Sequence, residues 1–420
     1  MPQLIPHALP PLADPTTHFR VLATADWQIG MVGGAYRTEA ATLLRAKRIE
    51  TIGVVLDVAE RAGARAILAA GDLFEFPDQP RETTAAIAKL LNKHRHVPVH
   101  AIPGNHDLHG PGTVWTQPEL LAVQHLKIHA ADGPVELNAG NAQTDNAQTD
   151  NAQTDNAQTP VTLWPLPVHS KYDSNEQQRR LEDVRATAGV HIVMAHGHDT
   201  SYLQFDHEEC VLPINSTAVI EKGYTLLVLG HWHSFHQINS RTVYPGTHEQ
   251  TKFGERDAGN VAIIDVPLDG SEPIFHKVRV GQFGWHSETI DCTGLVLPDA
   301  LEQRGREVSV DADFVSLTLT GEVGLNDALH ALPRARTAIA EMVEQLTWND
   351  QCRERIDLDA AVAEYELPQG LRQVQEALLQ ELIDADQTEA AGLRAELEVL
   401  YEVAGNVGAL TRSGASGATP

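Results

Sequence analysis

Residues 65–72 read RAILAAGD, an apolar run that ends in a glycine and an aspartate. A short continuous apolar run bounded by turn residues is typical of a strand buried on both faces. Helical periodicity over residues 39–62 and 80–95 lies on either side of this strand. Strands that alternate with helices predict an α/β layered domain. Further strands of the same kind are FRVLATAD (19–26), VPVHAIPGNHD (97–107), HIVMAH (191–196) and YTLLVLGH (224–231).

These five strands share a second feature, which is a possible metal ligand at the carboxyl end. In open α/β sheets, ligands gather outside the carboxyl ends of the strands, so these side chains are expected to meet at one edge. A single Gly-Asp or His-x-His is more often a turn, but five in order within 210 residues point to one site. They are Asp26-Trp27-Gln28, Gly71-Asp72, Gly104-Asn105-His106-Asp107, Ala195-His196 and Gly230-His231-Trp232-His233.

In this order the five segments resemble the calcineurin-like metallophosphoesterase family. The continuation Tyr244-Pro-Gly-Thr-His, the stretch 252–259 and the strand GNVAIIDV (259–266) are similar to its DNA-repair nuclease branch, which includes bacterial SbcD and the meiotic-recombination nuclease. The resemblance covers residues 19–280 and is looser beyond. It implies an α/β fold in which helices flank a two-sheet β-sandwich, with a C-terminal α/β cap and a helical segment.

The resemblance also implies a site with two divalent metal ions. Asp26, Gln28 and His233 would hold the first ion, Asn105, His196 and His231 the second, and Asp72 would bridge them. His106 would act on the scissile phosphate as a catalytic residue, with Asp107 orienting it. Two such ions can generate a nucleophile at neutral pH and neutralise the phosphoryl oxygens of a phosphodiester. The surplus positive charge of the two ions would attract phosphate to a strongly acidic protein.

Gln28 departs from the family, which usually has histidine at this position. An amide oxygen is a harder ligand than an imidazole nitrogen, so the site is expected to favour Mn²⁺, with Mg²⁺ as the second choice, over Zn²⁺. The other interpretation is that Gln28 is not a ligand and that the first metal site is impaired.

The domains are expected as follows. Residues 1–18 are predicted to be disordered, 19–280 to form the catalytic domain, and 139–160, with the NAQTD repeats, to be a surface loop within it. Residues 281–345 are predicted as the cap, with a strand over 313–321 and a helix over 325–346. Residues 346–405 are predicted as a helical partner-docking segment and 406–420 as a flexible tail. The apolar stripe of that segment either packs on the cap or, as the family resemblance implies, docks on the coiled coil of an SbcC-like SMC-type ATPase.

Composition limits the possible functions. The net charge of −26, most of it after residue 280, argues against holding nucleic acid by bulk electrostatics. No apolar run approaches the roughly 20 residues that span a bilayer. The N-terminus lacks a secretory signal, and the three cysteines form no disulfide framework, so a cytoplasmic protein without a membrane partner is expected.

The predicted function is that of a metal-dependent DNA nuclease, exonuclease and endonuclease, which hydrolyses phosphodiester bonds in DNA repair. Its partners would be DNA and the SbcC-like ATPase, and a homodimer is left open. One alternative is a phosphoesterase with the same centre that acts on cyclic nucleotides, phosphoproteins or small esters. Another is a non-catalytic binding subunit, which Gln28 would motivate.

Overall fold

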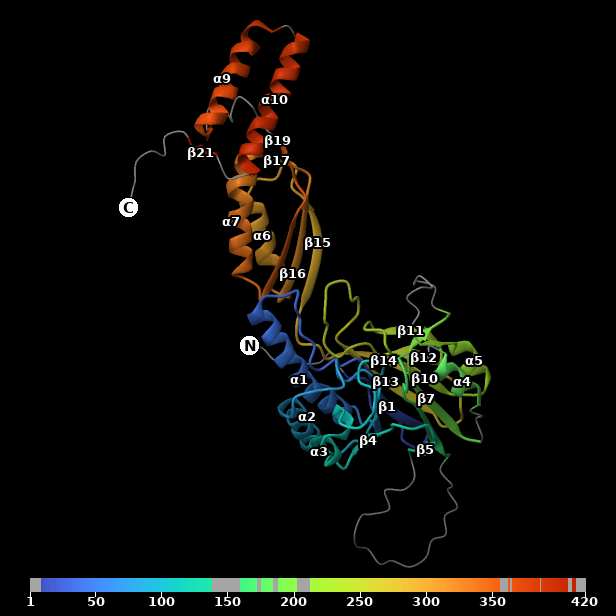
Figure 1. Cartoon of the computed structure of the whole chain (residues 1–420). Coiled ribbons are helices and arrows are strands. Elements are labelled where there is room, and N and C mark those ends of the chain that lie inside the picture. The colour runs from blue at the N-terminus through green and yellow to red at the C-terminus, as the bar shows by residue number, and fades with distance from the viewer. Residues whose placement is uncertain are drawn as a thin grey trace, which may run out of the picture. The chain divides into compact units, whose positions relative to one another are not determined.

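The computed structural model describes residues 9–137, 159–171, 175–183, 188–201, 212–355, 362, 365–385, 387–406 and 410–412. The predicted NAQTD loop, apart from residues 159 and 160, and the tail beyond Arg412 lie outside these residues. The chain forms two compact units, Met1–Phe283 and Gly284–Pro420, which are described separately (Figure 1).

The first unit contains two six-stranded sheets. In the first sheet, parallel pairing joins the strands that follow one another along the chain, and two antiparallel strands extend one edge. Its order is β14 (Ile274–Arg279), β13 (Asn260–Pro267), β1 (His18–Thr24), β2 (Ala66–Ala70), β3 (Val99–Ile102) and β4 (Leu126–Ile128).

The second sheet is parallel at its centre and antiparallel at both edges. Gly230 pairs with His196 in its register, so two of the predicted ligand segments leave neighbouring strands side by side. The order is β11 (His236–Asn239), β12 (Thr242–Tyr244), β10 (Leu226–Gly230), β7 (Val190–His196), β6 (Val161–Leu166) and β5 (Val135–Glu136).

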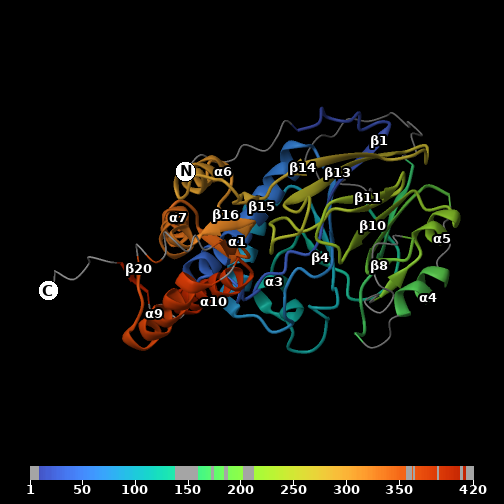
Figure 2. The same cartoon turned by 90° about the horizontal axis from the view of Figure 1, so that it is seen from above.

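The two sheets pack face to face, and helices cover their outer faces. Buried side chains of both sheets, such as Val21, Leu68 and Met194, form one core between them. Helices α1 (Thr38–Arg61) and α2 (Arg81–Lys93) pack on the first sheet, where Ile52 and Leu91 are buried. In both views α4 (Glu176–Asp183) and α5 (Ser216–Glu221) lie away from α1, against the second sheet (Figures 1 and 2). The predicted two-sheet sandwich flanked by helices is confirmed.

Shorter elements and the N-terminal segment complete this unit. The short elements are η1 (Val114–Thr116), α3 (Pro118–Leu121), β8 (His198–Asp199) and β9 (Pro213–Ile214). Part of the segment predicted to be disordered has a defined course, because the Arg20 guanidinium donates to the Pro11 carbonyl at 2.8 Å and Leu9 packs on the core. Residues 1–8 lie outside the described part of the chain.

The second unit begins with a three-stranded parallel sheet of β15 (Trp285–Asp291), β16 (Phe314–Thr320) and β18 (Gln345–Asp350). Helices α6 (Asp299–Val308) and α7 (Leu332–Ala340), the π-helical turn η3 (Asp327–Ala331) and the pair β17 (Glu322–Gly324) and β19 (Arg353–Arg355) complete it. The predicted helix over 325–346 is wrong at its C-terminal end. Residues from Gln345 instead pair with β16, and this long-range pairing outweighs the local helical pattern.

The C-terminal hairpin consists of α9 (Gln369–Asp384) and α10 (Gln387–Asn406), beside the pair β20 (Tyr365–Glu366) and β21 (Thr411–Arg412). The apolar stripe is divided. Leu397 and Tyr401 are fully buried in a cluster with Leu325, so part of the stripe belongs to the core of this unit. Other apolar side chains of the hairpin, Val374, Ile383, Val399 and Val403, remain exposed. No helix of the described residues has the length and apolarity to cross a bilayer.

Candidate metal centre

The loops that carry the predicted ligands run side by side at the carboxyl ends of β1 and β2. The Asp26 amide donates to the Gly71 carbonyl at 3.0 Å, and the Gln28 amide donates to the Asp72 carbonyl at 2.9 Å. Left-handed backbone is uncommon outside glycine and is concentrated at functional sites, where it costs of order 1–3 kcal/mol per residue. Four predicted ligands adopt it, with φ of 52° at Asp26, 42° at Gln28, 52° at Asp72 and 103° at His231.

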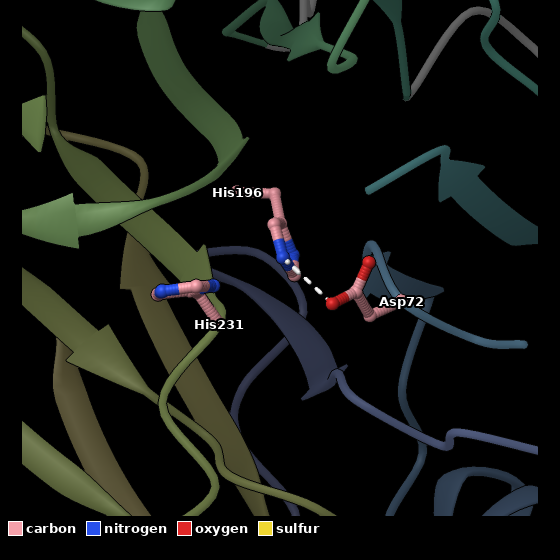
Figure 3. A group of neighbouring side chains, drawn as sticks. All are labelled: Asp72, His196 and His231. Carbon is pink, nitrogen blue, oxygen red and sulfur yellow. Dashed lines mark ion pairs between the residues drawn. The ribbon is translucent and has the colours of Figure 1, made fainter. Parts of the chain in front are cut away.

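Asp72, His196 and His231 form the centre of the site, with ligand atoms within 4.8 Å of one another (Figure 3). The His196 Nε2 lies 3.2 Å from the Asp72 carboxylate and 3.1 Å from the Asn105 Oδ1. The His196 Nδ1 lies 2.8 Å from the Ala70 carbonyl oxygen. Since a carbonyl can only accept, Nδ1 carries the hydrogen and Nε2 faces the carboxylate and the amide. This is the arrangement of a metal-ligating histidine whose other nitrogen is held by a backbone carbonyl.

Gly104 permits the close approach of the Asn105 loop to Asp72. A Cβ atom at position 104 would collide with the carboxylate and backbone nitrogen of Asp72. The Asp72 Oδ1 accepts from the His106 amide at 2.8 Å, which fixes the start of this loop against β2. The glycine before Asn105 is therefore a steric requirement of the site.

The predicted ligands of the first metal lie close to this centre. Asp26 is fully buried, and both of its carboxylate oxygens accept from the His231 amide, at 3.0 and 3.1 Å. The His233 Nδ1 lies 2.6 Å from the Glu255 carboxylate, so Nε2 is the nitrogen left for a metal. Gln28 and His233 both line the pocket described below.

Glu255 is a site residue that sequence reasoning missed. It is buried, and its carboxylate also accepts from the Thr251 amide at 2.8 Å and from the Thr251 hydroxyl. A carboxylate behind a ligating histidine fixes the ring and raises its basicity. The only signal in the sequence was its place in the stretch 252–259, whose resemblance assigned no role to it.

His106 and Asp107 have different surroundings from those predicted. The Asp107 carboxylate accepts backbone amides, from Gly104 at 2.6 Å and from Leu73 at 2.9 Å, so it braces two ligand loops. The prediction that it orients His106 is corrected. The His106 Nδ1 instead lies 3.2 Å from the carbonyl and 3.6 Å from the carboxylate of Glu75, with Nε2 4.0 Å from Asp72. Glu75 was not predicted.

Burial and charge together set the electrostatics of the site. Burial alone would raise the pKa of the Asp72 carboxyl, but the His196 imidazole holds that pKa well below its usual range. Burial also lowers the pKa of His196, yet the Asp72 carboxylate outweighs it and raises this pKa to about 9. Burial lowers the pKa of His231 to about 3, helped by the charge of His196. Because a ligating imidazole must be neutral, a metal ion would displace the proton that His196 and Asp72 share.

The buried Arg48 connects the loop of Trp27 with the loop of residues 247–249, behind the site. The Arg48 guanidinium donates to the carbonyls of Trp27 and Glu249 and to the Thr247 hydroxyl, the last at 3.2 Å. It comes from α1 and is 1% exposed. Burial lowers the pKa of Arg48 to about 10, with the Glu249 carboxylate opposing the shift, so it remains charged at neutral pH.

An open pocket of about 520 Å³ lies over the centre. Its floor includes Gln28, Asp72, His106, His231 and His233. Three other predicted residues, Asp26, His196 and Asp107, are fully buried, and Asn105 contacts His196. The structure thus brings all nine predicted site residues to the same end of the two sheets.

The donor set suits divalent metal ions. It combines carboxylate and amide oxygens with imidazole nitrogens, and the partners of His196 and His233 leave Nε2 free of its own hydrogen in the neutral ring. Asp72, Asn105, His196 and His231 would hold one ion. Asp26, Gln28 and His233 are the remaining predicted ligands, and they would hold the second ion.

Comparison with known proteins identifies the family. A family model described as calcineurin-like phosphoesterase matches residues 19–235, more than half of the chain. The chain belongs to the calcineurin-like phosphoesterase family. It is a metallophosphoesterase, a hydrolase of phosphoesters, and its family uses a dinuclear metal centre. No curated protein matches the chain.

Among solved structures, a dimetal phosphatase from Danio rerio is similar to this metallophosphoesterase with 11% identity. The similarity covers 62% of this chain and 99% of the phosphatase, with a TM-score of 0.35.

Proposed function

We propose that this metallophosphoesterase is a metal-dependent DNA nuclease that hydrolyses phosphodiester bonds, with Mn²⁺ as the preferred ion. The observation that carries the proposal is the placement of His106 at an open pocket whose floor holds the ligand cluster. The pocket volume of about 520 Å³ falls in the range of roughly 300–1,000 Å³ typical of sites for ligands larger than a phosphate group.

The chain's own residues suit a phosphodiester with a poor leaving group. Divalent ions, when bound, supply a nucleophile at neutral pH and neutralise the phosphoryl oxygens. The Glu75 carbonyl and carboxylate hold the His106 ring so that Nε2 points into the pocket region near Asp72. A proton on Nε2 can be donated to the departing oxygen, a general-acid role that contributes typically about 10²–10⁴-fold.

A metal-supplemented assay tests this proposal. Chelator-treated full-length protein is given Mn²⁺, Mg²⁺ or Zn²⁺ with single-stranded DNA, duplex DNA, bis(4-nitrophenyl) phosphate or 4-nitrophenyl phosphate. We expect Mn²⁺-dependent cleavage of DNA and of the diester. Asp72→Asn should abolish it, and Asp78→Asn, which changes an exposed aspartate six residues away, should not.

The other outcomes identify the alternatives. Hydrolysis of the monoester with intact DNA would show a phosphatase of another substrate class. Binding of metal and DNA without hydrolysis of any substrate would show a non-catalytic binding subunit.

We also propose an SbcC-like SMC-type ATPase as partner, docked on the exposed side chains of the α9–α10 hairpin. Val399 and Val403 are 55% and 50% exposed, whereas Tyr401 between them is fully buried. Val399→Asp with Val403→Asp should prevent co-purification with the ATPase while the protein stays folded. Co-purification of this double variant at the wild-type level would contradict the docking surface.

A further inference from the structure

The pocket over the metal centre has two walls of different chemistry. One group of lining residues, called the floor here, is polar and carries the candidate ligands. The other group, called the outer wall, consists of the loop from Met31 to Tyr36 and of Lys252. Val32 on this loop is 63% exposed, so the loop presents apolar surface beside the polar floor. A phosphate group alone would use only the floor.

Lys252 is the one lysine or arginine among the described residues that line the pocket. The structure shows no ion pair for its ammonium group within the part of the chain it describes, although the protein carries a net charge of −26. As the one cationic side chain that lines the pocket, Lys252 can bind an anionic group of the substrate as a point charge. Lys252 is not one of the candidate metal ligands, so it is available for a second anionic group besides the phosphate at the metals.

A chain of hydrogen bonds ties this wall to the metal centre. The Tyr36 hydroxyl donates to the Thr251 carbonyl at 2.9 Å, and Thr251 in turn donates to the Glu255 carboxylate. Glu255 lies 2.6 Å from the Nδ1 of His233. The Tyr36 ring and the Lys252 backbone are therefore held at a set position relative to a candidate ligand.

The wall offers an aromatic ring and neighbouring apolar side chains next to a single cation. Gly33, at φ +64°, turns the loop and lies beside the Tyr36 ring, where an added Cβ would approach its Cδ2 at 3.5 Å. Any of the nucleic-acid bases can stack on such a ring, because every base is planar and aromatic. A lysine ammonium binds a phosphate as a point charge. A nucleotide carries both groups, and a phosphorylated side chain of a protein does not.

We propose that Tyr36 and Lys252 form a subsite for the nucleotide adjacent to the scissile bond, with its base against the Met31–Tyr36 loop and its own phosphate at Lys252. This inference rests on the proposed nuclease function and specifies its substrate as a strand with at least two phosphates. Lys252 and Tyr36 act as specificity residues.

Dinucleotides test the phosphate part directly. TpT carries only the scissile phosphate, and pTpT and TpTp carry a second phosphate at the 5′ or the 3′ end. We expect the kcat/KM of the wild type to be about tenfold higher for either pTpT or TpTp than for TpT. This gain is the size expected of a hydrogen bond to a charged group. Lys252→Met should remove this gain, whereas Lys89→Met, at an exposed lysine on α2, should keep it. Absence of any gain, or a gain that survives in Lys252→Met, would overturn the inference.

A second pair of substrates tests the stacking of the base on Tyr36. The ratio of kcat/KM for thymidine 5′-(4-nitrophenyl phosphate) to that for bis(4-nitrophenyl) phosphate should fall about tenfold in Tyr36→Leu and stay near the wild-type value in Tyr36→Phe, because the ring is retained. An equal ratio in wild type and Tyr36→Leu would remove the base from the proposal.

Binding gives a readout that is independent of turnover. In a His106→Ala background, calorimetry with Mn²⁺ should show that Lys252→Met raises the Kd for the preferred diphosphorylated dinucleotide about tenfold. Equal Kd values would refute the subsite even if DNA is cleaved. A wild type that cleaves neither DNA nor dinucleotides would instead refute the proposed function.

Discussion

Replacing Arg48 by methionine should both destabilise the catalytic unit and loosen the metal site. The guanidinium donates to the Trp27 carbonyl in the Asp26–Gln28 loop and to the Glu249 carbonyl in the loop that leads to Glu255. Methionine fills a similar volume but has no hydrogen-bond donor, so both carbonyls lose the hydrogen bond from Arg48.

The size of the loss in the free energy of unfolding depends on which of these carbonyls still accepts a hydrogen bond from another donor. The Glu249 carbonyl also accepts from the Thr247 hydroxyl at 2.9 Å, so it remains satisfied. The Trp27 carbonyl loses the Arg48 donor, and an unsatisfied buried acceptor costs about 1–3 kcal/mol. Removal of the cation also leaves the buried Glu249 carboxylate less compensated, and a broken buried charge network costs up to about 3–5 kcal/mol. We expect a loss of about 2–4 kcal/mol in the free energy of unfolding of this unit.

Urea unfolding followed by tryptophan fluorescence measures the loss, with Arg45→Met as the control. Arg45 lies on the same helix, but its hydrogen bonds to the Val32 carbonyl and the Thr42 hydroxyl are exposed. Arg48→Lys should recover only part of the stability, because an ammonium cannot match the planar fork. Calorimetry with Mn²⁺ should show the weaker binding step of Arg48→Met reduced by about 10–100-fold, since the Asp26–Gln28 loop is no longer held. A change below about 0.5 kcal/mol, the size of an ordinary surface substitution, together with unchanged metal binding would refute this reasoning.

Four further predictions address the site and the core. Asp72→Ala should abolish hydrolysis and weaken both metal-binding steps while circular dichroism stays unchanged; retention of both steps would remove Asp72 as the bridge. Gln28→His should tighten the weaker step by about 10–100-fold if Gln28 is a ligand, and identical titrations would exclude it. Glu255→Gln should reduce Mn²⁺ affinity by about 10–100-fold, because the imidazole it holds loses its carboxylate partner; unchanged affinity would make Glu255 purely structural.

The stacked pair His100 and His129, with ring nitrogens 3.0 Å apart, is buried so that the pKa of each falls to about 4. In the unfolded chain these histidines bind protons as the pH falls through about 6.5, whereas in the folded protein they do so only near pH 4. The free energy of unfolding is therefore highest above about pH 6.5 and falls as the pH drops toward 4, by up to about 3 kcal/mol for each histidine. Comparison with His129→Leu in urea at pH 7 and pH 4.5 should show a smaller loss in the variant, and parallel losses would be evidence against the pair.

The candidate site could be predicted largely from the sequence because strand ends carry their own signal. A strand buried on both faces must be apolar along its length, so an Asp, Asn or His directly after it marks the edge of the sheet. This holds for Asp26, Asp72, Asn105, His196 and His231, which the structure places within one cluster of loops. The same local pattern predicted the central strands and the helices between them.

What only the tertiary structure decided are the partners of these residues. Asp107 follows His106 in the chain, yet its carboxylate binds the Leu73 and Phe74 amides 34 and 33 residues away. Glu255 reaches His233 across 22 residues, and Arg48 reaches Glu249 across 201. Strand β18 begins at Gln345, within the end of the predicted helix, because pairing with β16 was available. Such contacts depend on which surfaces the fold brings together, and no periodicity or spacing in the chain records that.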